Sequence, residues 1–139
     1  MSNNIVIITC SKSKYNRYNV PAYMLYKGPY FQLKLKYAMS LHLPIFIISA
    51  LYGLIPMEKE ISVYDKTIDL LTERERETIQ DQIEKFFSIC KYGKIYFIGS
   101  GRYLFLFDKI KGRIKIESPI AGLDRIDGTK YLRERIKEL

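Results

Sequence analysis

The stretch Ile5-Val6-Ile7-Ile8-Thr9-Cys10-Ser11-Lys12-Ser13-Lys14 joins an apolar run directly to a short polar loop. Four consecutive β-branched residues predict a strand that is buried on both faces, as strands of a parallel sheet are. In open α/β sheets, ligands bind beyond the carboxyl ends of the strands, and this loop follows such an end. Backbone N–H groups, hydroxyls and ammonium groups suit an anion such as a phosphate. We therefore expect the substrate to be bound by Cys10, Ser11, Lys12, Ser13 and Lys14.

Three more apolar runs predict strands at residues 45–48, 94–98 and 113–117, in addition to the first strand at residues 4–9. Helices are predicted at residues 29–41, 72–90 and 129–138, with a shorter helix after Gly101. Strands that alternate with helices indicate a doubly wound sheet, and 139 residues suit one domain. The sequence thus predicts a single three-layer α/β domain over residues 1–139, with a mainly parallel four-stranded sheet of order 2-1-3-4.

The sequence also predicts structural roles for several single residues. Thr72 and Glu75 have the spacing of a capping box, which predicts the start of a helix. Cys90, at the end of that helix, is expected to be a small core residue. Lys34 is expected to lie off the apolar stripe of the helix at residues 29–41. His42, which follows that helix, is expected to cap its C-terminal end.

Four unusual loops each follow a predicted strand, at residues 10–14, 49–56, 99–102 and 118–123. If the strand order is 2-1-3-4, all four gather at one edge of the sheet and line one pocket. Residues 49–56 are expected to fold back into this pocket as an apolar loop. The Gly-Ser-Gly turn is expected to present backbone N–H groups to an anion. The further substrate-binding candidates are Ser49, Tyr52, Gly53, Gly99, Ser100, Gly101 and Arg102.

The chain is strongly basic, with a formal net charge of +8. A basic excess favours a polyanionic partner, most often nucleic acid or otherwise a nucleotide, but a lysine-rich composition of the source organism is an equal explanation. Two cysteines and one histidine do not suggest a metal site, and no cofactor is expected. With neither a signal-type segment nor an apolar stretch of about 20 residues, a cytoplasmic protein without a membrane partner is expected.

Several of these loops carry motifs of a known family. The motifs are C-S-K-S-K at residues 10–14, P-A-x-x-L-Y-x-G-x-x-F at residues 21–31 and S-A-x-Y-G-L-I at residues 49–55. Together they resemble a family of small bacterial, archaeal and phage proteins known only as a domain of unknown function. The chain is more distantly similar to the central domain of archaeosine synthase, of whose signature it keeps Cys10 and Lys14. That resemblance implies a uracil-DNA glycosylase-like fold and relatives that handle bases in nucleic acid.

These observations predict a nucleotide- or nucleic-acid-binding domain that acts on a base or its N-glycosidic bond. Cleaving that bond needs a carboxylate to position water or to stabilise an oxocarbenium-like centre. Asp65 is the leading candidate, although an Asx-turn there is equally expected; the competing acidic residues are Glu58, Glu60 and Asp69. The alternative is a non-enzymatic module that binds nucleic acid or another partner.

Overall fold

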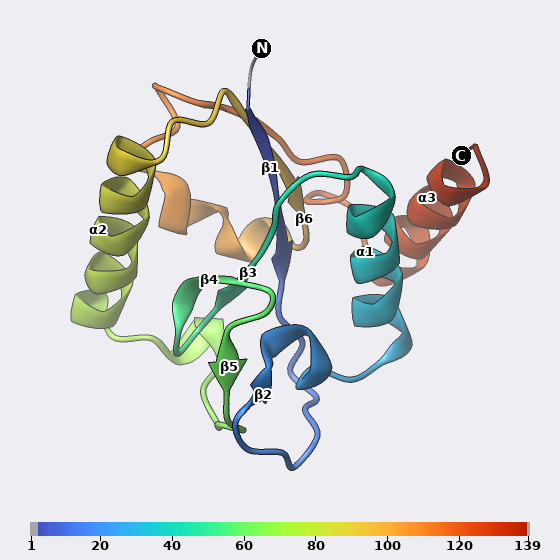
Figure 1. Ribbon diagram of the computed structural model, residues 1–139, viewed down its shortest axis with the longest axis horizontal. Coiled ribbons are helices and arrows are strands. Elements are labelled where there is room, and N and C mark those ends of the chain that lie inside the picture. The colour runs from blue at the N-terminus through green and yellow to red at the C-terminus, as the bar shows by residue number, and fades with distance from the viewer. Residues whose placement is uncertain (1–2, 139) are drawn as a thin grey trace.

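A five-stranded sheet forms the centre of the computed structural model, which describes residues 3–138 (Figure 1). The sheet order is β4-β3-β1-β6-β7, and all neighbouring strands are parallel except β3 and β4. The strands are β1 (Asn4–Thr9), β3 (Ile45–Ser49), β4 (Gly53–Pro56), β6 (Lys94–Ile98) and β7 (Lys115–Glu117). The four parallel strands have the predicted order 2-1-3-4, so the mixed α/β architecture is confirmed.

The fifth strand, β4, is a correction to the predicted four-stranded sheet. Residues 49–56 do not form a loop that folds back into a pocket; they make a tight hairpin with β3. Gly53 adopts φ 70°, a conformation that residues with a side chain rarely take, and it pairs with Ser49 across the turn. Leu54 and Ile55 are buried, so the apolar character of the segment serves an antiparallel edge strand.

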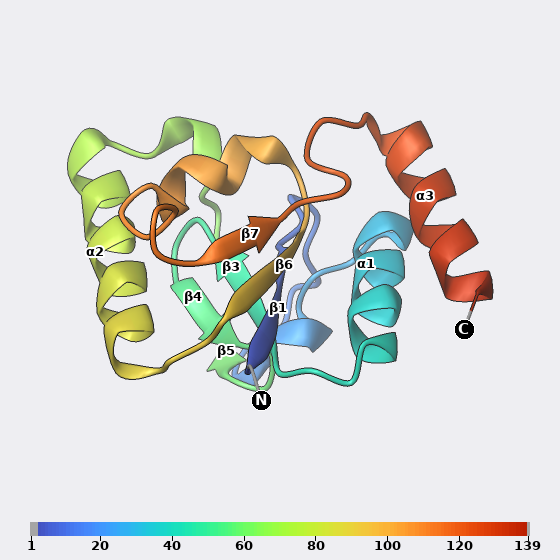
Figure 2. The same cartoon turned by 90° about the horizontal axis from the view of Figure 1, so that it is seen from above.

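Helices cover both faces of the sheet (Figures 1 and 2). Helices α1 (Pro29–Ser40) and α3 (Arg125–Lys137) lie together on one face. Helix α2 (Glu73–Ile89) and the 3₁₀ helix η3 (Gly101–Phe107) lie on the other. The side chains of β1 alternate between two apolar cores: Ile5 and Ile7 belong to the core with α2 and η3, and Val6 and Ile8 to the core with α1. The predicted three layers are confirmed.

The long segment between β4 and α2 has its own short elements. Strand β5 (Glu60–Ile61) pairs with β2 (Val20–Pro21) to form a small antiparallel ribbon. The segment then forms the short 3₁₀ helix η2 (Ile68–Leu70), and a similar helix η1 (Ala22–Met24) follows β2. Figure 1 shows this ribbon beyond the end of the central sheet. The ribbon therefore extends the carboxyl side of the sheet, where α1 also begins.

The ends of several elements depend on local caps. Helix α2 begins with the predicted capping box between Thr72 and Glu75. Helix α3 begins at Arg125, four residues before the predicted start at residue 129, because the Asp124 carboxylate accepts a hydrogen bond from the Asp127 backbone N–H at 2.8 Å. His42 has φ 54° just after α1, a left-handed conformation that ends helices.

Burial corrects two expectations for helix residues. Lys34 is only 5% exposed and belongs to the buried side of α1, whereas Cys90 is exposed just after α2. The Cys90 backbone has already left the helical conformation, with φ −95° and ψ 110°. Within residues 3–138, none of the helices combines the length and the apolar character needed to span a membrane.

Candidate functional site

A cavity of about 500 Å³ lies at the carboxyl ends of β1 and β6. The first turns of α1 and α3, the loop after β1, the segment around η2 and the start of η3 surround it. This is the edge at which ligands of open α/β sheets bind. The lining residues are Thr9, Cys10, Ser11, Lys12, Ser13, Lys14, Lys27, Gly28, Pro29, Tyr30, Phe31, Lys34, Lys66, Thr67, Ile68, Asp69, Ser100, Arg102, Tyr103 and Arg125.

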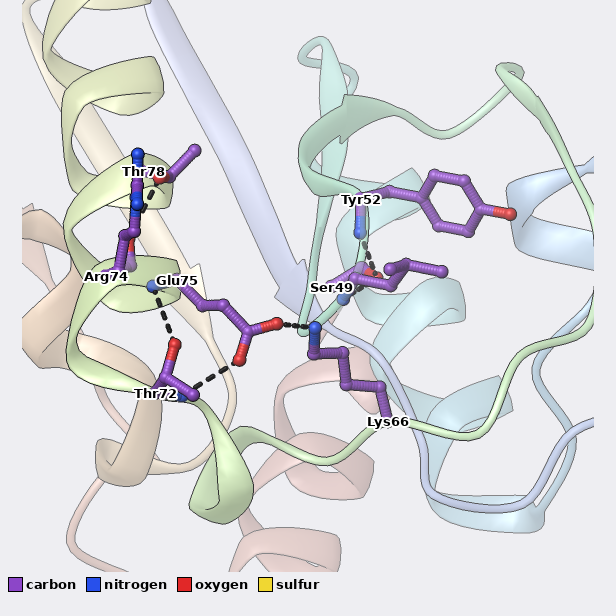
Figure 3. A network of polar contacts seen from close by, with 8 residues as sticks. Ser49, Tyr52, Lys66, Thr72, Arg74, Glu75 and Thr78 are labelled. Carbon is purple, nitrogen blue, oxygen red and sulfur yellow. Dashed lines mark hydrogen bonds and ion pairs between the residues drawn. The ribbon is translucent and has the colours of Figure 1, made fainter.

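The charged side chains that line the cavity are mostly basic. Its only acidic residue is Asp69, which forms an ion pair with Arg102. Lys66 is paired with Glu75 of α2, whose carboxylate also accepts the Thr72 backbone N–H (Figure 3). Five basic side chains of the cavity form no ion pair with the described residues: Lys12, Lys14, Lys27, Lys34 and Arg125. The cavity therefore has a strong excess of positive charge.

Lys34 is the most deeply buried of these basic residues. Its Nζ donates hydrogen bonds to the Thr9 hydroxyl at 2.7 Å and to the Thr9 carbonyl oxygen at 3.1 Å. Burial lowers the pKa of Lys34 to about 8; nearby Cys10 opposes this change and nearby Arg125 adds to it. The amine at this position is thus easier to deprotonate than an ordinary lysine side chain.

Gly99 makes room for the side chain that holds Lys34. A Cβ atom at residue 99 would lie 2.2 Å from Thr9 Cγ2 and 2.4 Å from Thr9 Oγ1. The contact is possible because β1 and β6 are adjacent and parallel, so residues 9 and 99 follow paired positions. Gly99, a predicted binding residue, therefore does not line the cavity; its lack of a side chain leaves the space that Thr9 occupies.

The other residues of the Gly-Ser-Gly turn already have hydrogen-bond partners. The Gly101 N–H donates to the Ala121 carbonyl oxygen at 3.1 Å. The Arg102 N–H donates to the Ser100 hydroxyl at 3.2 Å, which caps η3. These hydrogen bonds hold η3 and the loop after β7. Ser100 and Arg102 line the cavity as predicted, whereas Gly101 and the loop at residues 118–123 do not line it.

The loop after β1 supplies one wall of the cavity, and all five of its predicted residues line it. The Ser11 hydroxyl donates to the Ser13 carbonyl oxygen at 2.6 Å, and Lys14 Nζ donates to the Lys12 carbonyl oxygen at 3.1 Å. Partial burial lowers the pKa of Lys14. The Cys10 thiol lies 3.4 Å from the Tyr103 hydroxyl. This wall thus places amines, hydroxyls and one thiol around the same space.

Ser49, Tyr52 and Gly53 do not line the cavity, although they were predicted to bind the substrate. The Ser49 hydroxyl accepts the Tyr52 N–H at 3.1 Å (Figure 3). It also lies 2.8 Å from the Tyr64 hydroxyl. The Tyr64 hydroxyl also lies 2.8 Å from that of Tyr26. Burial raises the pKa of both tyrosines, so this chain of hydroxyls remains neutral. The hydrogen bond between Ser49 and Tyr64 connects the β3–β4 turn to the segment that follows β5.

Asp65 is exposed and is not part of the cavity lining. It is near Lys14, where its charge favours the protonated amine. Asp69, one of the competing carboxylates, lines the cavity instead. A catalytic role for either carboxylate stays a prediction.

The sequence reasoning missed several lining residues, including Lys27, Tyr30, Lys34, Lys66 and Tyr103. For Lys34 a signal was present, because it shares the helical spacing of three buried apolar neighbours: Phe31, Leu35 and Ala38. Among the described residues, no group of three or more His, Cys, Asp and Glu side chains could hold a metal ion. The site offers cations, hydroxyls, the Lys34 amine, the Cys10 thiol and the Asp69 carboxylate as its chemical groups.

Comparisons with known proteins place this chain in a family. The model described as "Family of unknown function (DUF6884)" matches residues 5–134. A solved structure described as "AF0587, a protein of unknown function" is similar, with a TM-score of 0.58 and 15% identity. That match covers 98% of this chain and 45% of the other, so this chain spans less than half of that protein, and the likeness shows the fold alone. No curated protein matches. Similarity to archaeosine synthase stays a prediction.

Proposed function

The chain belongs to this family of unknown function, and we propose that its basic cavity binds the phosphate of a nucleotide, either free or within a nucleic acid strand. The main evidence is the charge of the lining. Five of its basic side chains form no ion pair with the described residues, and its one carboxylate, Asp69, is already paired with Arg102. Cations held together without counter-charge repel one another, and an anionic ligand removes that repulsion.

The first turn of α1 supports a phosphate at this place. Gly28, Pro29, Tyr30 and Phe31 line the cavity, and no side chain caps the start of the helix. The unpaired N–H groups of a helix N-terminus and its dipole favour negative charge. The helix therefore adds to the field of the basic side chains rather than opposing it.

The size and aromatic content of the cavity support a nucleotide rather than phosphate alone. A volume of about 500 Å³ is within the range of small-molecule sites. Tyr30 and Tyr103 line it with partly exposed side chains, and aromatic faces stack on bases without regard to base identity. Lys27 and Arg125 lie with them in the lining and are suited to contact the phosphate.

A second candidate function is action on the base or its N-glycosidic bond, as a uracil-DNA glycosylase-like fold would imply. The observation that favours it is Asp69, a carboxylate in the lining and held by Arg102. Such a carboxylate could stabilise positive charge that develops on the sugar. Asp65 remains the competing candidate. The alternative is a module that binds the same ligand without changing it.

Binding to nucleoside 5′-monophosphates and to the matching nucleosides tests the proposal. We expect the monophosphates to bind and the nucleosides to bind much more weakly in isothermal titration calorimetry. Arg125→Ala removes a cation from the cavity and should weaken monophosphate binding about tenfold. Arg133→Ala, on an exposed position of the same helix, is the matched control and should bind as the wild type does.

The change in salt dependence between Arg125→Ala and Arg133→Ala separates binding in the cavity from nonspecific contacts, which also weaken with salt. Affinity for a 5′-phosphorylated oligonucleotide should fall with salt, and its log–log slope should lose about one unit in Arg125→Ala. Equal loss in Arg125→Ala and Arg133→Ala, or affinity that is flat in salt, would overturn the proposal. Mass spectrometry of the same mixtures for released base then separates an enzyme from a binding module.

A further inference from the structure

Helix α1 carries an amine that is both buried and part of the cavity lining. Lys34 is 5% exposed, yet it lines the cavity together with Cys10 and Tyr30. Lysine is almost never fully buried unless it is paired with an acidic group, and Lys34 has no ion-pair partner among the described residues. Its position thus needs an explanation beyond packing.

Burial and nearby Arg125 favour the neutral form of the Lys34 amine, whereas nearby Cys10 favours the charged form. The groups that face it are the Thr9 hydroxyl and carbonyl oxygen at the end of β1, the Cys10 thiol, the Tyr30 ring 5.2 Å away and Arg125 of α3. Burial lowers its pKa from 10.5 to about 8, so at pH 7 the neutral fraction is about 300-fold greater than that of an ordinary lysine. An amine that is partly neutral at pH 7 is a nucleophile.

We propose that Lys34 Nζ forms an imine with the aldehyde of a phosphorylated pentose held in the cavity. The nitrogen lone pair adds to the carbonyl carbon and gives a carbinolamine. The former carbonyl oxygen then leaves as water, with one hydrogen from the nitrogen and one proton from solvent. A protonated C=N bond to Lys34 remains. No group is oxidised or reduced in this step.

The substrate class follows from the two kinds of group in the lining. The basic side chains select the phosphate, so this inference rests on the proposed function, and the amine selects a carbonyl carbon. The open-chain form of 2-deoxyribose 5-phosphate carries both groups. The same chemistry occurs as a free sugar phosphate and as an abasic site in a nucleic acid strand. The cavity volume of about 500 Å³ accepts one such unit.

Borohydride trapping tests the imine directly. The wild-type protein is incubated with 2-deoxyribose 5-phosphate or with an oligonucleotide that contains one abasic site, reduced with sodium cyanoborohydride and mapped by peptide mass spectrometry. At pH 7 we expect the adduct at Lys34 to exceed that at any other lysine by about tenfold or more, because its amine is the more neutral one. The more reactive probe identifies the source of the aldehyde.

Variants and a second ligand make the result decisive. Lys34→Met should abolish the trapped adduct, and Lys36→Met, at an exposed position of the same helix, should leave it unchanged. Unphosphorylated 2-deoxyribose should react far less. Nucleotide binding that weakens in Arg125→Ala, together with no adduct at Lys34 in the wild-type protein, would overturn the imine and leave the proposed function intact. Equal labelling by the unphosphorylated sugar would overturn the role of the cavity in choosing the substrate.

Discussion

Replacing Lys34 with methionine should change how the stability of the protein depends on pH. The substitution keeps an unbranched apolar side chain in the core of α1 and removes the titrating amine. It also leaves the Thr9 hydroxyl and carbonyl oxygen without the Lys34 donor, at a cost that does not vary with pH. The informative quantity is therefore the difference between wild type and Lys34→Met as the pH rises.

The sign follows from proton binding. Because the pKa of Lys34 is about 8 in the folded protein and 10.5 in the unfolded chain, the unfolded chain binds more protons between these values. The free energy of unfolding therefore rises with pH through this window. From pH 7 to pH 10, the wild type should gain roughly 2–3 kcal/mol relative to Lys34→Met. Buried tyrosines with raised pKa are present in both proteins, so their effects cancel in the difference.

Urea denaturation followed by circular dichroism, at pH 7, 8, 9 and 10 with a thiol reductant, measures this difference. The control is Lys36→Met, whose stability relative to the wild type should stay constant over the same range, since residue 36 is exposed. Parallel curves for wild type and Lys34→Met would show that the amine has an ordinary pKa. That result would remove the premise of a neutral Lys34.

Three further variants test the supports of the site and fold by urea denaturation at pH 7. Gly99→Ala places a Cβ 2.2 Å from Thr9 Cγ2 and should lower the free energy of unfolding by about 1–3 kcal/mol. Gly112→Ala, with no atom within 4 Å of its Cβ, is the control and should stay within about 0.5 kcal/mol of wild type. Equal values for the two variants would refute the close contact. Thr72→Ala removes the cap of α2 and should cost about 1 kcal/mol, so an unchanged midpoint would contradict the capping box. Tyr64→Phe leaves the Tyr26 hydroxyl without its hydrogen-bond partner, removes one of the partners of the Ser49 hydroxyl, and should cost about 1–3 kcal/mol; a neutral effect would mean that the hydroxyl chain does not stabilise the β3–β4 turn.

The sheet was largely predictable because its parallel strands are short apolar runs between helices. Burial on both faces requires such runs, and the order 2-1-3-4 is that of a common class of doubly wound sheets. Strand β4 was not predictable in the same way. Its Gly53 and Pro56 are residues that normally mark loops, and only pairing with β3 reveals that one supplies the turn and the other ends an edge strand.

The site was predictable where it depends on strand ends. The loop at residues 10–14, Ser100 and Arg102 reach one cavity because β1 and β6 are neighbours. The β3–β4 turn, which was also assigned to the pocket, does not line the cavity, and hydrogen bonds within the turn and to Tyr64 hold Ser49. Lys34 was missed because burial of a charged group is costly, so a lysine on a helix is expected to be exposed.

Three residues at the carboxyl end of β1 connect the packing of the fold with the proposed chemistry. Gly99 after β6 leaves space for Thr9, and Thr9 holds the amine of Lys34 from α1. A lowered pKa of about 8 means that keeping this amine charged in the folded protein costs about 3 kcal/mol, a substantial part of the roughly 5–15 kcal/mol that stabilises a domain. An apolar side chain at the same helical position would avoid that cost but could supply neither a cation nor a nucleophile to the cavity. The proposed role in binding a ligand would account for the cost of burying this amine, which forms no ion pair with the described residues.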